Sequence, residues 1–129
     1  MRTLKVGIAS YEEMKARTLA IARGEYKPGP NEPRIWFTSP DSFAKVLSTN
    51  NRAVLEVIAA TAPSSLTELA ALTGRKKSNL SRTLKTMAHY GLVRLKKGER
   101  GCIIPEVPYT DIELVVPLRR NRGPIASAA

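Results

Sequence analysis

The side chains best suited to recognising another molecule lie between Arg75 and Val93, in the stretch RKKSNLSRTLKTMAHYGLV. On a helix that turns by about 100° per residue, three apolar side chains share one face: Leu80, Leu84 and Met87. Hydroxyl and cationic side chains fall on nearly the opposite face, at i, i+3, i+4 and i+7: Ser78, Ser81, Arg82 and Lys85. The stretch therefore predicts a helix that buries its leucines and presents hydrogen-bond donors to a partner.

The positive charge of the chain is concentrated around this helix. The 129 residues include 21 Lys or Arg and 11 Asp or Glu, which gives a net charge of +10. Residues 75–101 hold nine of the basic residues and one of the acidic residues, a net charge of +8. Such a concentration attracts polyanions, with nucleic acid the first candidate and an anionic membrane surface the second.

Duplex DNA offers the best chemical match to these side chains, because its major groove admits one α-helix and exposes the base edges. Arg82 matches guanine and Asn79 matches adenine through paired hydrogen bonds. Lysine ammonium groups suit phosphates instead, since they provide little directional readout. The predicted DNA-binding residues are Arg75, Lys76, Lys77, Ser78, Asn79, Ser81, Arg82, Lys85, Lys96, Lys97 and Arg100.

A charged stripe on a surface helix is usually only solvated, but the neighbouring elements favour DNA here. A shorter helix precedes the stripe; a capping box at Ser65 and Glu68 opens it and Gly74 ends it. A basic hairpin, LVRLKKGERGCIIP, follows directly, with Val93 and Leu95 predicted to point inward. A helix, a glycine turn, a basic helix and a basic hairpin in this order suit a DNA groove.

Alternating apolar residues and capping signals predict the other elements. In chain order they are a strand over residues 3–9, a helix from Ser10 to about Arg23, a loop over 26–33, a strand over 34–38, a helix from Pro40, a helix capped by Thr49 or Asn50, and a strand over 110–118.

The stretch SSLTELAALTGRKKSNLSRTLKTMAHYGLVRLKKGERG resembles the winged helix-turn-helix of MarR-like and ArsR-like regulators. KSNLSRTLK and GLV carry the resemblance, although Lys76 stands where many relatives have a serine helix cap. The whole chain also resembles a small family of MarR-like antitoxins. The resemblance implies an α+β winged helix-turn-helix, with an N-terminal strand-helix extension over 1–47 and a DNA-binding domain with a terminal strand over 48–118. Residues 119–129 contain too few apolar side chains to fold, so a flexible tail is predicted there. The resemblance further implies a repressor that binds a toxin protein and regulates its own operon.

A single winged helix reads only a few base pairs, so we predict a two-fold homodimer on a palindromic operator. The strands outside the minimal winged helix are predicted to form the dimer contact, through Leu4, Val6, Ile8, Ile112, Leu114 and Val116. Two alternatives remain open. One is a stand-alone repressor without a toxin partner, and the other is a winged helix that binds RNA.

The sequence gives little support to an enzyme. It contains one histidine, no glycine-rich phosphate loop and no Ser-His-Asp set, so no catalytic residue, metal or cofactor is predicted. A single cysteine, Cys102, excludes an intrachain disulfide and a cysteine-rich zinc site. No apolar run has the length of a membrane span, and no secretion signal opens the chain. We therefore predict a cytoplasmic protein without membrane binding.

Overall fold

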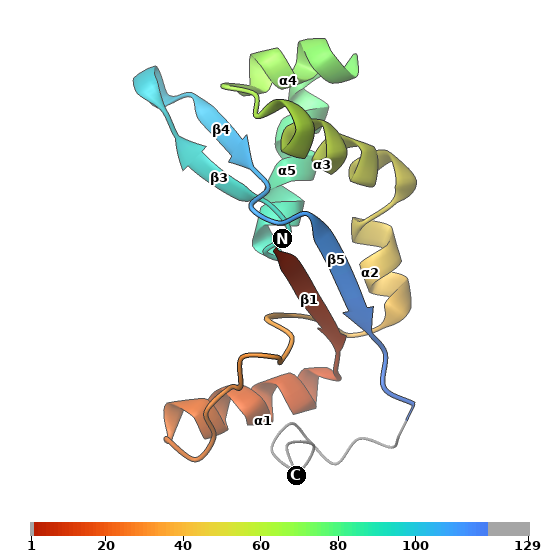
Figure 1. Cartoon of the computed structure of the whole chain (residues 1–129), viewed down its shortest axis with the longest axis vertical. Coiled ribbons are helices and arrows are strands. Elements are labelled where there is room, and N and C mark those ends of the chain that lie inside the picture. Colours follow the sequence, from red (N-terminus) through yellow and green to blue (C-terminus); the bar gives the residue numbers. More distant parts are fainter. Residues whose placement is uncertain (1, 119–129) are drawn as a thin grey trace. The chain divides into compact units, whose positions relative to one another are not determined.

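The computed structural model describes residues 2–118, so the tail predicted over 119–129 lies outside the described residues. Within that range the chain is α+β, as predicted, and no single helix is long and apolar enough to cross a membrane. The elements are β1 Thr3–Ile8, α1 Tyr11–Ala22, β2 Ile35–Phe37, α2 Pro40–Val46, α3 Thr49–Thr61, α4 Leu66–Thr73, α5 Lys77–His89, β3 Arg94–Lys97, a 3-10 turn Glu99–Gly101, β4 Ile103–Glu106 and β5 Asp111–Val115 (Figure 1). They fall into two compact units, one built on Ala44–Asp111 and the other on Leu4–Phe43 with the residues from Ile112 onward.

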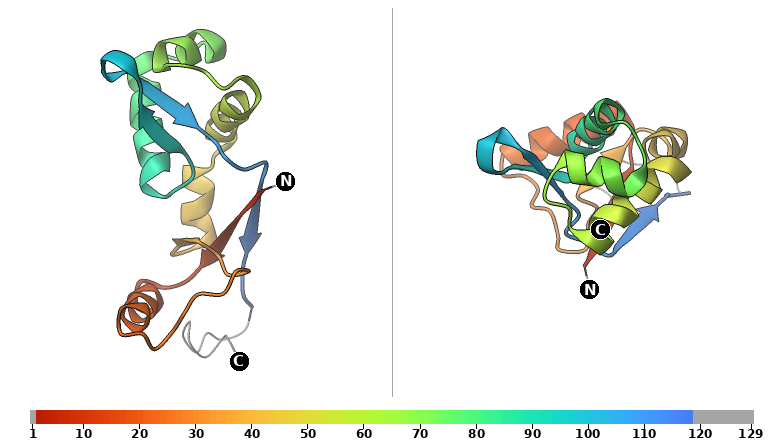
Figure 2. Two further views of the ribbon diagram at one scale, coloured as in Figure 1. Left: turned by 60° about the vertical axis from the view of Figure 1, so that its left-hand side comes forward. Right: turned by 90° about the horizontal axis from the view of Figure 1, so that it is seen from above.

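The first unit packs α3, α4 and α5 together, and the antiparallel hairpin of β3 and β4 packs against all three helices (Figure 2). Each helix contributes one apolar stripe to a shared core, as expected for amphipathic helices. The stripes consist of Val54, Leu55 and Ile58 on α3, Leu66 and Leu69 on α4, and Leu80, Leu84 and Met87 on α5. The inward direction predicted for Val93 is confirmed, since this residue is buried next to Leu92.

The cap of α3 lies one residue earlier than predicted. Ser48, rather than Thr49 or Asn50, has the extended backbone of an N-cap, and its hydroxyl accepts a hydrogen bond from the N–H of Asn51 at 3.2 Å. The side-chain amide of Asn51 donates in turn to the carbonyl of Val46 at 3.0 Å. This pair of bonds places Thr49 and Asn50 in the first turn of the helix, where their side chains are exposed.

The start of α4 forms only half of the predicted capping box. The Ser65 hydroxyl accepts from the N–H of Glu68 at 3.1 Å, as predicted. The Glu68 carboxylate, however, accepts from the N–H and hydroxyl of Ser64, at 2.7 and 2.6 Å, and not from Ser65. These two bonds lower the pKa of the Glu68 carboxyl below its ordinary value. Gly74 ends α4 in the left-handed conformation that favours glycine, with φ at 72°.

The second unit is a three-stranded parallel sheet in the order β2-β1-β5, with α1 connecting the first two strands along the chain. Val6 lies opposite Ile35, and Ile8 lies opposite Phe37. The capping box predicted at Ser10 is confirmed in both directions. β5 ends at Val115, so Val116 and Leu118 of the strand predicted over 110–118 lie beyond it.

Glu32 organises the predicted loop over residues 26–33. Its carboxylate accepts hydrogen bonds from the Tyr26 hydroxyl and from the N–H of Gly29, and it lies 3.7 Å from the guanidinium of Arg17. The central carbon of the Arg17 guanidinium also lies 5.3 Å from the centre of the Trp36 ring, within the range of a cation–π contact. Trp36 therefore packs inside this unit.

The close approach of Gly7 to Trp36 gives a stability prediction. A methyl group built on Gly7 lies 2.5 Å from one ring carbon of Trp36, closer than real contacts allow. We expect Gly7→Ala to lower the free energy of unfolding by about 1–3 kcal/mol, the usual cost of overpacking a filled site. Urea unfolding followed by fluorescence reports this directly, because Trp36 is the only tryptophan.

Gly29→Ala is the matched control, since nothing lies within 4 Å of a methyl group placed there. Equal urea midpoints for the two variants contradict the packing of Trp36 over β1.

Candidate nucleic-acid interface

α5 has the two faces that its sequence predicts. Leu80 and Met87 are completely buried, and Leu84 is 1% exposed. No side chain caps the helix at Lys76, and no acidic residue lies in its first turn. The predicted departure at Lys76 is thus confirmed, and the positive end of the helix dipole carries no compensating carboxylate.

Most of the predicted DNA-binding side chains reach solvent. Among the described residues, nine of the eleven are exposed: Lys76, Lys77, Ser78, Asn79, Arg82, Lys85, Lys96, Lys97 and Arg100. Ser81 and Arg75 are half-buried. Seven of the nine exposed residues carry a positive charge, and they come from α5, the residue before it and the following hairpin, so the charge lies on adjacent elements of one unit.

Arg75 lies differently from the other predicted contacts. Its guanidinium bends back toward α5, with Nη2 3.5 Å from the Thr83 hydroxyl that accepts its hydrogen bond. The other terminal nitrogen, Nη1, is buried and has no hydrogen-bond partner among the described residues. The backbone N–H of Arg75 donates to the Thr73 hydroxyl at 3.3 Å. Through its backbone and its side chain, Arg75 thus links the end of α4 to the middle of α5.

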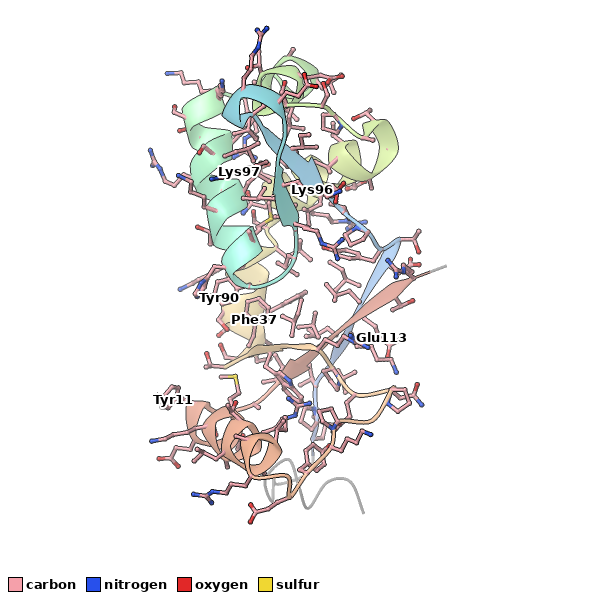
Figure 3. The ribbon with its side chains drawn as sticks, turned by 90° about the vertical axis from the view of Figure 1, so that its left-hand side faces the viewer. Tyr11, Phe37, Tyr90, Lys96, Lys97 and Glu113 are labelled. Atoms are coloured by element: carbon pink, nitrogen blue, oxygen red, sulfur yellow. The ribbon has the colours of Figure 1, made fainter. Side chains whose placement is uncertain are left out.

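The hairpin that follows α5 places its lysines in two different environments (Figure 3). Lys96 lies 3.4 Å from the Glu106 carboxylate on β4, so part of its charge is already compensated. Lys97 is exposed and has no ion pair among the described residues. At the tip, Arg100 adopts the left-handed conformation, with φ at 58°. The N–H of Gly98 donates to the carbonyl of Cys102 at 2.6 Å, which closes the turn.

Tyr109 anchors the end of the hairpin to the end of α5. Its hydroxyl donates a hydrogen bond to the carbonyl of Leu92. Burial raises the pKa of this hydroxyl to about 12, because the ionised form loses its hydration. Sequence reasoning missed this residue, and it also missed Glu106 and Thr83, which hold two of the predicted cationic contacts. The only sequence signal for Glu106 is its position on the strand predicted to pair with Lys96.

The charge of the chain divides unevenly between the two units. The described residues of the unit built on Ala44–Asp111 include twelve Lys or Arg and five Asp or Glu, a net charge of +7. The described residues of the other unit hold six of each and are neutral. No group of three His, Cys, Asp or Glu side chains within residues 2–118 is placed to hold a metal ion. The basic face of α5 and its hairpin is therefore the strongest candidate site on the described chain.

A comparison with models of known families matches residues 46–114 to the model described as HVO_A0114. The match covers more than half of the 129 residues and includes α3, α4, α5 and the β3–β4 hairpin. No curated protein and no solved structure matches the chain.

Proposed function

The chain belongs to the HVO_A0114 family, and we propose that its matched region is a winged helix-turn-helix that binds duplex DNA in a sequence-specific way. In this proposal α4 and α5 are the two helices of the motif, and the β3–β4 hairpin is the wing. The protein is a transcriptional repressor of the kind that MarR-like and ArsR-like regulators represent. It acts as a homodimer on a palindromic operator, because one motif reads only a few base pairs.

The observation that carries this proposal is the two-faced character of α5. Its leucines are buried in the core, so the helix can present only its opposite face to a partner. That face exposes Ser78, Arg82 and Lys85, and the uncapped start of the helix adds free backbone N–H groups. Cationic side chains and a helix N-terminus both favour phosphates, while the forked groups of Arg82 and Asn79 match base edges.

The roles of the predicted residues divide by their chemistry. Arg82 and Asn79 read bases, and the exposed lysines contact phosphates without reading sequence. Arg75 donates a hydrogen bond to Thr83, and its other terminal nitrogen is buried. Its role in this proposal is to hold the start of α5 in place.

Selection of bound sequences from a random pool of duplex DNA tests the proposal. We expect enrichment of one sequence with two inverted half-sites, as a two-fold dimer requires. A pool without enrichment contradicts the proposal and indicates non-specific binding. Equal affinity for duplex RNA in a competition assay contradicts it and indicates an RNA-binding protein. The antitoxin role implied by the resemblance is tested separately, by co-purification of the product of a neighbouring gene.

Lys97 provides a test of the phosphate contacts. We expect Lys97→Ala to weaken binding to all duplex sequences about equally, because an ammonium group on the hairpin meets the backbone. The slope of log K against log salt should fall by about 1, the change for one lost phosphate contact. Titration of fluorescent duplexes at several salt concentrations measures both quantities.

Lys27→Ala is the control, since this lysine is also exposed but lies in the other unit, outside the predicted interface. A salt slope that stays at the wild-type value in Lys97→Ala removes the hairpin from the proposed interface.

A further inference from the structure

β5 forms an open edge of the parallel sheet. It lies beside β1, and no other strand flanks it in the described part of the chain. The carbonyl of Arg2 accepts from the N–H of Thr110, just before β5, at 2.9 Å and from the N–H of Asp111, the first residue of β5, at 3.4 Å, so the N–H of Asp111 points toward the β1 side. Because backbone groups alternate along a strand, the N–H and C=O of Ile112 and Leu114 face the open edge. An edge of this kind is a template for another strand.

The side chains of β5 protect this edge only in part. Ile112 and Leu114 are only half-buried on one face of the sheet, and Val115 on the other face is 43% exposed. Val116 is also 43% exposed, just beyond the strand. Natural edge strands are usually guarded by lysine, proline or a bulge. Residues 111–116 contain no lysine or proline, and their charged residues are Asp111 and Glu113, whose repulsion restricts the possible registers.

Charge indicates which occupant this edge accepts. Two copies of the protein repel each other most strongly through the unit with a net charge of +7. The unit that contains most of β5 carries +3 when Arg119, Arg120 and Arg122 are counted, so the repulsion between two copies is weakest there. A nucleic acid is attracted more strongly to the unit with +7, and it has no peptide strand to add to a sheet edge. We propose that β5 pairs antiparallel with β5 of a second copy, so that the two sheets become one. This inference rests on the homodimer of the proposed function and names its contact.

The acidic residues select the register of this pairing. A two-fold axis at Glu113 places the two copies of this carboxylate opposite each other, and an axis at Ile112 places Asp111 opposite Glu113; both arrangements are destabilising. An axis at Leu114 places Glu113 opposite Val115 of the second copy. The outward N–H and C=O of Leu114 then bond to the same residue of the second copy. Among registers free of facing acids, this one keeps most of β5 paired.

A charge exchange at Val115 tests both the surface and the register. Glu113, labelled in Figure 3, projects from β5 and is exposed, so charges opposite it act directly. Val115→Glu places a second carboxylate against Glu113 of the other copy, whereas Val115→Lys places an ammonium group there. Because each dimer contains the pair twice, we expect the dimer of Val115→Glu to dissociate at least about tenfold more readily than that of Val115→Lys. The double variant Glu113→Lys with Val115→Glu should restore the affinity.

Sedimentation velocity of the full chain without DNA, over a range of micromolar concentrations, measures these dissociation constants. Equal values for the two Val115 variants, or a monomeric wild-type chain, overturn the pairing. The measurement is separate from DNA binding. A wild-type chain that dimerises through β5 but enriches no duplex sequence disproves only the proposed function. A chain that binds its operator while the two Val115 variants dimerise equally disproves only the β5 contact.

Discussion

We expect Arg82→Ala to lower the affinity for the selected operator by about 1–3 kcal/mol, a change of roughly 5- to 150-fold. The side chain is exposed on α5, and no hydrogen bond or ion pair holds it among the described residues. Its loss should therefore leave the fold unchanged and remove the paired hydrogen bonds that we propose between Arg82 and a guanine. Titration of the enriched duplex and of a scrambled duplex measures the effect, which should be larger for the enriched sequence.

Two further variants separate base reading from charge. Arg82→Lys keeps the positive charge but cannot make the forked pair of bonds, so it should lose most of the discrimination and little of the non-specific affinity. Arg52→Ala removes another exposed arginine, from α3, where it lies 3.5 Å from Glu56. This control should bind like the wild type. If Arg82→Ala keeps both its affinity and its discrimination, the face of α5 assigned to base reading is wrong.

The sequence predicts α5 well because burial and exposure follow the helical period without interruption. Leu80, Leu84 and Met87 share one face in the pattern, and all three are at most 1% exposed in the structure. A helix with this pattern has one stable orientation against a core, since turning it buries cations and exposes leucines. The missing side-chain cap at Lys76 could be predicted for a similar reason, because lysine has no acceptor oxygen.

Helix ends and side-chain partners are less predictable from the sequence. The run Ser48-Thr49-Asn50-Asn51 offers four residues that can cap a helix, and the bond between Asn51 and Val46 decides among them. The contact of Arg75 with Thr83 depends on a rotamer that no residue pattern specifies. The ion pair between Lys96 and Glu106 depends on the register of a hairpin whose turn includes a left-handed arginine.

The predicted dimer contact shows what an alternating pattern leaves open. Alternation placed Leu4, Val6 and Ile8 in the same predicted interface as the residues of β5. The structure buries Val6 completely within its own chain, because β1 is the central strand of the sheet. Alternation alone cannot distinguish a central strand from an edge strand, since both bury one face. The position of β5 at the edge makes it the better candidate for pairing with a second copy.

Leu84→Ala should have the largest effect on stability, lowering the free energy of unfolding by about 2–5 kcal/mol. The side chain is 1% exposed between α5 and its neighbours, so its removal leaves a cavity that the packed core cannot fill. Urea unfolding followed by circular dichroism at helical wavelengths measures the change. Lys85→Ala is the matched control from the next position, and its exposed side chain should change stability by no more than about 0.5 kcal/mol.

Comparing the leucine and arginine variants tests the two-faced helix as a whole. If α5 sits as described, Arg82→Ala loses operator affinity at unchanged stability. Leu84→Ala loses stability. At low temperature and without denaturant, the molecules of this variant that remain folded should bind the operator like the wild type. If instead Arg82→Ala loses stability and Leu84→Ala loses operator affinity, the cationic face of α5 must be turned into the protein. In that case the buried and exposed faces of α5 are exchanged, and both the DNA-binding proposal and the residue roles derived from it fail together.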